Sequence, residues 1–61
     1  MKISITGAEL IKEDSHYSVV YKDQVIYEAD KQFYALIVAL SRDNCEQRLQ
    51  MINDEKNINT Q

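Results

Sequence analysis

Asp14, Ser15 and His16 are the residues best suited to catalysis, because they bring the three residue types of a hydrolase triad together in consecutive positions. A working triad is a spatial arrangement in which each side chain lies within hydrogen-bond reach of the next. Here the three residues follow one another along the chain, and His16 is the only histidine. We therefore interpret the string as a turn that carries an exposed histidine.

Cys45 is the only cysteine, so one chain cannot form a disulfide, and the sequence has no Cys/His cluster of the kind that binds zinc. The nearby carboxylates of Asp43 and Glu46 would raise the pKa of the thiol instead of producing a reactive thiolate. Cys45 also shares one predicted helical stripe with Leu49 and Ile52, which suits a small buried residue. We predict a structural cysteine.

The remaining acidic pairs, Glu13-Asp14 and Asp54-Glu55, fall in a predicted turn and in the tail, where no apolar pocket could tune them for acid-base catalysis. A phosphate-binding loop needs several glycines, and Gly7 is the only glycine. The sequence therefore predicts a protein that is not an enzyme and that uses no cofactor and no metal.

Alternation of apolar and polar residues predicts strands from Met1 to Ala29. Ile3 and Ile5 alternate with polar residues before Gly7, and the segment 10–12 continues the same ribbon. Two further strands, 17–21 and 25–29, follow the polar clusters at 13–15 and 22–24. We predict a small antiparallel three-stranded sheet, a β-meander.

Loop length decides the register of the second hairpin. A three-residue loop at 22–24 places six apolar residues on one face, in the pairs Tyr17 with Ala29, Val19 with Tyr27 and Tyr21 with Val25. A two-residue loop would instead pair Tyr21 with Gln24 and bring polar groups onto that face. We therefore predict the three-residue loop, although this turn lacks the Gly or Asn usual at a left-handed position.

The second half of the chain is predicted to be helical. Eight consecutive apolar residues, from Phe33 to Leu40, favour a helix with Asp30 as its N-cap, with a buried strand at 37–38 as the alternative. Asp43 followed by Glu46 resembles a capping box.

The predicted fold is therefore α+β, a meander followed by one long helix from 31 to about 53 or by two short helices that break near Asp43. Residues 1–54 form a single domain, and residues 55–61 form a disordered C-terminal tail.

The run from Phe33 to Leu40 points apolar side chains in every direction around a helix, whereas a surface helix keeps a polar back. A chain near 60 residues buries only about 60% of the surface that its unfolded form exposes, so a partner is expected to add burial. We predict that Leu36, Ile37 and Leu40 form a dimer or partner interface, and that Phe33 faces the sheet.

Three tyrosines extend this interface prediction: Tyr17, Tyr21 and Tyr34. In one interpretation they cover the core face of the sheet with their hydroxyls at its rim, and in the other they stay exposed as anchors, a role in which tyrosine is enriched. The edge strands of the sheet offer a second mode, because they can add a strand from a partner.

Ten acidic and seven basic residues give a formal net charge of −3, and the bases are scattered along the chain. Strong nucleic-acid binding needs clustered cations, so this pattern argues against a nucleic-acid partner. The N-terminus lacks the apolar segment of a signal peptide, and eight apolar residues fall far short of the roughly 20 that span a bilayer. We therefore expect a cytoplasmic protein without a membrane partner.

Two functional hypotheses follow. The first is a small non-catalytic regulatory or inhibitory protein, a homodimer that acts by binding a protein the sequence does not identify. A phage or other mobile-element origin belongs to this hypothesis, on the grounds of short length and a composition that leans toward Ile, Lys and Asn. The second is a nucleic-acid-associated transcriptional regulator, in which dimerisation gathers the scattered bases on one surface.

Overall fold

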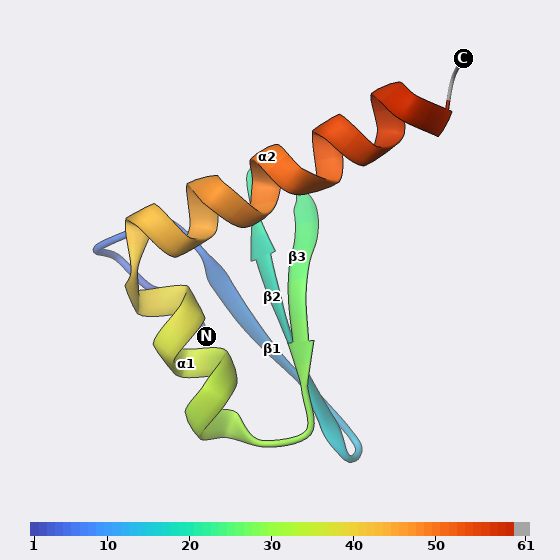
Figure 1. The fold of residues 1–61 in the computed structure, drawn as a ribbon. Coiled ribbons are helices and arrows are strands. Elements are labelled where there is room, and N and C mark those ends of the chain that lie inside the picture. Colours follow the sequence, from blue (N-terminus) through green and yellow to red (C-terminus); the bar gives the residue numbers. More distant parts are fainter. Residues whose placement is uncertain (60–61) are drawn as a thin grey trace.

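A computed structural model describes the backbone of residues 1–59 and the side chains of residues 1–56. Three strands, β1 (Glu9–Glu13), β2 (His16–Tyr21) and β3 (Gln24–Ala29), precede two helices, α1 (Gln32–Leu40) and α2 (Arg42–Asn59). The strands form one antiparallel sheet in the order β1-β2-β3. Both helices pack on one face of this sheet (Figure 1). The predicted α+β meander is confirmed, in its version with two helices.

The chain breaks between α1 and α2 at Ser41, which adopts an extended backbone conformation. The Ser41 hydroxyl accepts a hydrogen bond from the backbone N–H of Asn44 at 3.3 Å, so Ser41 caps α2. The capping box predicted at Asp43 is wrong, because Asp43 lies inside the first turn of α2 and the Glu46 carboxylate contacts Tyr21 and Lys22. The N-cap of α1 is Lys31, not Asp30, and no side chain caps that end.

Helix α2 continues to Asn59, whereas the sequence predicted a disordered tail from residue 55. Once a helix has nucleated, each added residue gains a hydrogen bond, and Glu55 and Lys56 are good helix formers. The last turns project past the end of the sheet (Figure 1). Residues 60–61, which belong to the predicted tail, lie outside the described residues.

The N-terminal segment forms a tight turn in place of the predicted strand. Gly7 has a φ of 81°, and its N–H donates to the carbonyl of Ile3 at 2.7 Å. The Thr6 hydroxyl donates to the carbonyl of Ala39 at 2.7 Å, which ties this turn to the end of α1. As a result Ile3 is buried and Ile5 is exposed, and only an isolated bridge from Lys2 to Glu9 extends the sheet.

The second hairpin combines the two registers considered from the sequence. Its loop has two residues, Lys22 and Asp23, both with positive φ, and Tyr21 pairs with Gln24. A bulge follows, because Val20 pairs with Val25 and Val19 with Tyr27, which leaves Ile26 without a partner.

The bulge restores the predicted pairs Val19–Tyr27 and Tyr17–Ala29, and it leaves Ile26 buried. The predicted pair of Tyr21 with Val25 is wrong. Short-range turn geometry sets the loop, and the bulge then brings the apolar face back into register.

The hydrophobic core lies between the sheet and the helices. From α1 it takes Ala35, Val38 and Ala39, which share one helical face. From α2 it takes Cys45 and Leu49, with Ile52 partly buried beside them, as the predicted stripe requires. The small residues of α1 let this helix approach the sheet closely, and the larger side chains of the same run therefore point away from it.

Candidate protein-binding surface

Four large apolar or aromatic side chains cover the side of α1 that faces away from the sheet. Their exposed fractions are 67% for Phe33, 53% for Tyr34, 47% for Ile37 and 46% for Leu40. We call these four residues the α1 outer face. Scattered exposed apolar residues are normal on a soluble protein, but a contiguous group is typical of an interaction site.

Helical geometry explains why these residues gather. At about 100° per residue, Phe33, Ile37 and Leu40 fall at i, i+4 and i+7 and share one stripe, opposite to the buried Ala35 and Val38. Tyr34 flanks the stripe, and its ring meets that of Phe33 edge-on, with centroids 5.7 Å apart. The surface from Phe33 to Leu40 is therefore largely apolar and carries no charged side chain of α1.

The structure assigns different environments to the six residues predicted as an interface. Tyr34, Ile37 and Leu40 are exposed together on the α1 outer face, whereas Leu36 is partly buried and packs against the core. Phe33 was predicted to face the sheet and is the most exposed of the group. Hydrophobicity could not show which face of the helix packs on the sheet, since all eight residues of the run are apolar. The sizes of the residues could have shown it, because the small residues pack closest to the sheet.

The two strand tyrosines do not join this surface. Tyr17 is partly buried against the core, and Tyr21 is buried, with 5% of its surface exposed. The Tyr21 hydroxyl donates a hydrogen bond to the carboxylate of Glu46, which also forms an ion pair with Lys22 at 3.0 Å. The interface prediction is therefore wrong for Tyr21, because its hydroxyl finds a partner on α2.

The contacts of Glu46 shift the pKa values of Tyr21, Lys22 and Glu46 itself. The hydrogen bond from Tyr21, followed by that from Lys22, lowers the pKa of the Glu46 carboxyl. The hydrogen bond to Glu46 raises the pKa of Tyr21 and of Lys22. The charged Glu46 carboxylate favours a neutral Tyr21 and a protonated Lys22, and both of these groups donate to it. Glu46 therefore joins the β2–β3 turn to α2.

Cys45 is fully buried, and its thiol lies 3.4 Å from the carbonyl of Val38. Burial, with a smaller contribution from the charge of Glu46, raises the pKa of the thiol. The predicted burial of Cys45 is confirmed. A protonated thiol shielded from solvent is a poor nucleophile.

His16 lies on the face of the sheet that the helices leave uncovered. Its Nε2 atom is 3.4 Å from the Glu28 carboxylate and 3.8 Å from that of Glu13. The acidic neighbours of His16 are therefore Glu28 and Glu13. Among residues 1–56, no group of three or more His, Cys, Asp and Glu side chains is placed to hold a metal ion.

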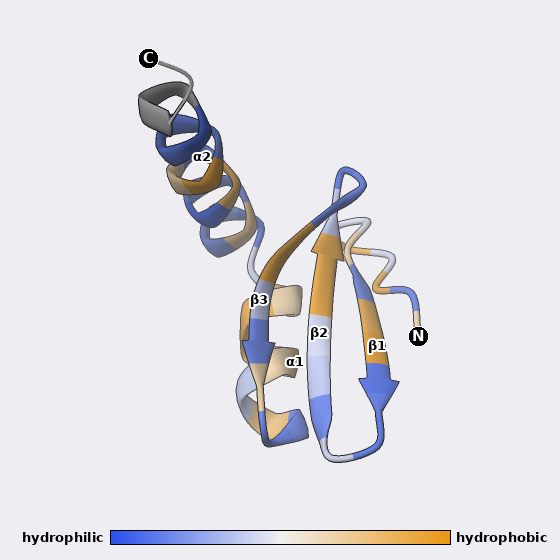
Figure 2. Cartoon of the chain, turned by 90° about the vertical axis from the view of Figure 1, so that its right-hand side faces the viewer, coloured by the Kyte–Doolittle hydropathy of each residue, from blue (hydrophilic) through white to orange (hydrophobic). Residues whose placement is uncertain are grey.

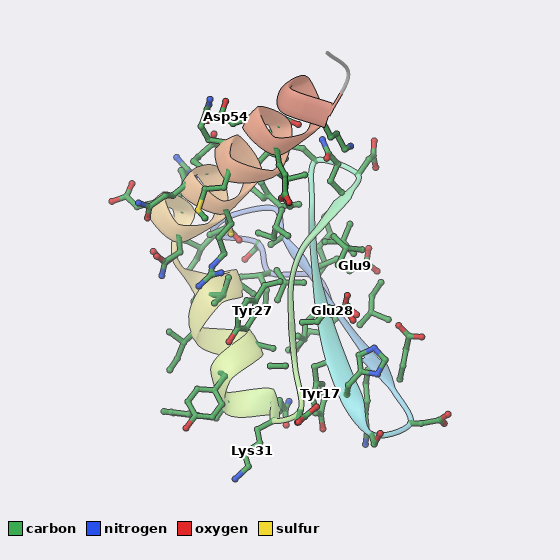
Figure 3. All side chains as sticks on the ribbon, turned by 45° about the vertical axis from the view of Figure 1, so that its right-hand side comes forward. Glu9, Tyr17, Tyr27, Glu28, Lys31 and Asp54 are labelled. Atoms are coloured by element: carbon green, nitrogen blue, oxygen red, sulfur yellow. The ribbon has the colours of Figure 1, made fainter. Side chains whose placement is uncertain are left out.

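The uncovered face of the sheet is mixed in character. Glu9 and Glu28 lie on this side and Tyr27 lies on the helix side (Figure 3). Ile11 and Val25 supply exposed apolar area between the carboxylates, and the strands carry alternating hydrophilic and hydrophobic segments (Figure 2). Such a mixture is usual for the solvated face of an antiparallel sheet. The α1 outer face is therefore the more distinctive surface.

The two edges of the sheet differ. The outer edge of β1 is partly covered, since the backbone groups of Met1 and Leu10 exchange hydrogen bonds of 2.7 Å. The edge strand β3 carries the bulge at Ile26, a feature that discourages strand addition. Neither edge offers a long, regular row of backbone groups to a partner strand.

Several of the basic residues already have partners within the molecule. Lys22 pairs with Glu46, and Arg42 donates to the carbonyl of Ile5 at 3.0 Å. The Arg48 guanidinium lies over the Tyr27 ring, 4.4 Å from its centroid. These contacts leave fewer cations for phosphate groups, and they give the nucleic-acid hypothesis no support.

Within residues 1–59, neither helix combines the length and the apolar character needed to cross a membrane. Comparisons of the chain with protein-family models, with curated proteins and with solved structures find no match.

Proposed function

We propose that this chain is a small non-catalytic regulatory or inhibitory protein that acts in the cytoplasm by binding another protein. The observation that carries the proposal is the α1 outer face, a contiguous apolar surface on a helix whose other side is already packed. The aromatic pair Phe33 and Tyr34 belongs to the residue types that anchor protein interfaces.

We also propose that two copies of the chain cover this face for one another when no target is bound. The four side chains offer on the order of 400 Å² of exposed surface, given roughly 150–250 Å² for a large side chain and the exposed fractions above. A stable interface buries about 800 Å² on each partner, so the homodimer is expected to be weak and readily exchanged for a target.

The test is affinity capture from the native host with three baits: the wild-type chain, Ile37→Asp and Met51→Asp. Met51 is 63% exposed on α2, so its replacement introduces the same charge outside the α1 outer face. We expect a protein that is retained by the wild type and by Met51→Asp and lost with Ile37→Asp. Folding of each bait is checked by circular dichroism.

Equal retention of the captured proteins by Ile37→Asp would show that the α1 outer face is not the binding surface. Recovery of nucleic acid alone, surviving moderate salt and lost on replacing Arg42 and Arg48, would support the transcriptional regulator instead.

A further inference from the structure

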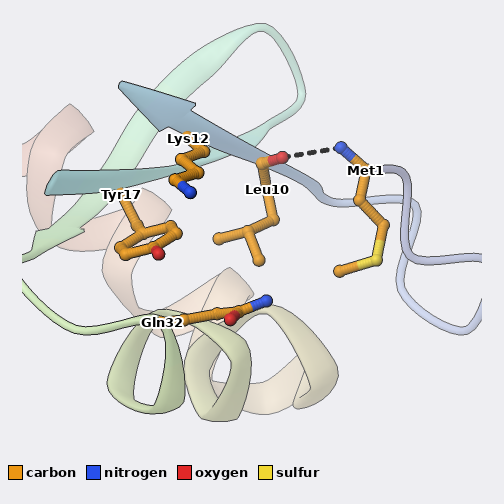
Figure 4. Close-up of a pocket in the computed structure, with 5 residues that line it drawn as sticks. All are labelled: Met1, Leu10, Lys12, Tyr17 and Gln32. Carbon is orange, nitrogen blue, oxygen red and sulfur yellow. Dashed lines mark hydrogen bonds between the residues drawn. The ribbon is translucent and has the colours of Figure 1, made fainter. Parts of the chain in front are cut away.

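An open cavity of about 260 Å³ lies between the sheet and the first turn of α1. Its walls come from three elements and the N-terminus: Met1, Leu10 and Lys12 of β1, Tyr17 of β2 and Gln32 of α1. Figure 4 shows the Lys12 amine and the Gln32 amide on opposite sides of the opening, with the Leu10 and Met1 side chains beside them. None of these residues belongs to the α1 outer face.

Lys12 places its amine on the helix-facing side of β1, beside the cavity. Side chains alternate along a strand, so Lys12 shares the helix-facing side of β1 with the buried Leu10, while Ile11 lies on the uncovered side and is 37% exposed. Ile11 and Lys12 are both exposed, but Lys12 lies on the side of β1 that borders the cavity. The ion pairs among residues 1–56 do not include Lys12.

The neighbours of Lys12 leave room beside its amine. Tyr17 stands opposite Lys12 in the β1–β2 register, and on its other side Tyr17 pairs with Ala29, whose side chain is a single methyl group. The cavity walls contain no carboxylate, although acids outnumber bases in the chain. The wall side chains therefore comprise one cation, two neutral hydrogen-bonding groups and two apolar groups, and the α-ammonium of Met1 donates to the Leu10 carbonyl at 2.7 Å.

We propose that this cavity binds a small aliphatic carboxylate. The Lys12 ammonium and the Gln32 side-chain amide donate to the carboxylate oxygens, and the Tyr17 hydroxyl supplies a third donor. The alkyl chain lies against Leu10 and the Met1 thioether, which tolerate chains of varied shape.

The dimensions of the cavity limit the ligand to a short chain. Ligand pockets for drug-sized molecules begin at about 300 Å³, so a carboxylate of about four to six carbons fits here. The cavity is open, so the ion pair between Lys12 and the carboxylate remains in contact with water. We therefore expect a dissociation constant for the carboxylate on the order of 1 mM.

The experiment is an NMR titration of the ¹⁵N-labelled full chain with hexanoate, hexylamine and acetate. Hexanoate should shift the amide signals of Leu10, Lys12, Tyr17 and Gln32 along a saturating curve, whereas hexylamine should not. Acetate should bind at least about fivefold more weakly, because it lacks the alkyl chain, whose buried methylenes add affinity.

Two matched variants locate the site. Lys12→Gln should weaken hexanoate binding by at least about fivefold, whereas Lys31→Gln, which removes the same charge from an exposed lysine outside the cavity walls, should leave it within about twofold. Lys12→Arg should retain binding. Lys12 is exposed, so the dispersion of the spectrum is expected to show each variant folded.

Any of three results would overturn the proposal: the same shifts with hexylamine, an unchanged affinity in Lys12→Gln, or shifts spread over all the lysines. The residues of the α1 outer face do not line the cavity, so this result is independent of the result for protein binding.

Discussion

The hydroxyl of Tyr21, the last residue of β2, donates a hydrogen bond to the carboxylate of Glu46 in α2. The two residues are 25 positions apart in the sequence. Lys22 completes the contact through its ion pair with the same carboxylate, 3.0 Å away. Tyr21, Lys22 and Glu46 together connect the β2–β3 turn to α2, the helix that follows the break at Ser41. These contacts orient α2 relative to the sheet.

Glu46 should make the stability of the fold depend on acid pH. The hydrogen bond from Tyr21 lowers its pKa in the folded state below the ordinary value of 4.5, so its stabilising contribution is complete above about pH 4.5 and is lost as the pH falls through the lowered pKa. We predict that Glu46→Gln lowers the urea midpoint at pH 7 and that the difference from the wild type shrinks below about pH 4.5.

Tyr21→Phe is the control for this prediction, because it removes the main hydrogen bond to the carboxylate and keeps the ring in the core. In that background Glu46→Gln should have a smaller effect at pH 7. An unchanged difference between wild type and Glu46→Gln from pH 3 to pH 7 would contradict the assignment.

The β2–β3 turn should gain stability from a glycine. Asp23 has a φ of 65°, in the left-handed region where a Cβ atom costs about 1–2 kcal/mol for most residues and less for Asp. We predict that Asp23→Gly raises the free energy of unfolding by roughly 0.5 kcal/mol, since relief of strain exceeds the added backbone entropy. Asp23→Ala, which keeps the Cβ atom, should lower it. Urea unfolding of the wild type and the two variants measures whether each substitution raises or lowers the free energy of unfolding.

Cys45 should be protected from thiol reagents in the native state. Burial raises the pKa of its thiol, so the folded protein keeps it protonated at a pH where a free thiol begins to ionise. We predict labelling at pH 8 at least about 10³-fold slower than in urea, because reaction waits for opening of the fold. Cys45→Ala should cost about 1 kcal/mol of stability. Labelling at the rate of an unfolded chain would contradict the observed burial.

Periodicity made much of the fold predictable. Alternation in 17–21 and 25–29 located β2 and β3, and the spacing of Cys45, Leu49 and Ile52 identified the buried face of α2. These signals are local and repeat along the element, so the sequence alone contains them.

Other features depended on contacts that the sequence does not display. The turn requires a two-residue loop, and the apolar residues further along β3 require the register of a three-residue loop. The bulge at Ile26 allows both, and neither requirement alone predicts the observed pairing. Ile3 and Ile5 alternate as a strand would, but Gly7 and the Thr6 bond to Ala39 fold this segment into a turn.

The exposure of the α1 outer face could be predicted only in part. Tyr34, Ile37 and Leu40 are exposed as expected, because one apolar run is too long for one buried face. Phe33 was assigned to the wrong side, since packing of the small Ala35 and Ala39 against the sheet decides the rotation of α1. Tyr21 was misplaced because its partner, Glu46, lies on a different element.

Sedimentation velocity of the wild type, Ile37→Asp and Met51→Asp tests the proposed α1 outer face most directly. Between about 10 µM and about 0.5 mM, the wild type and Met51→Asp should shift from monomer toward dimer, as expected of a small and weak apolar interface. Ile37→Asp should remain a folded monomer throughout, because the dimer would bury its charge against an apolar surface. A wild type that stays monomeric over the whole range, or an Ile37→Asp variant that associates equally well, would contradict the account.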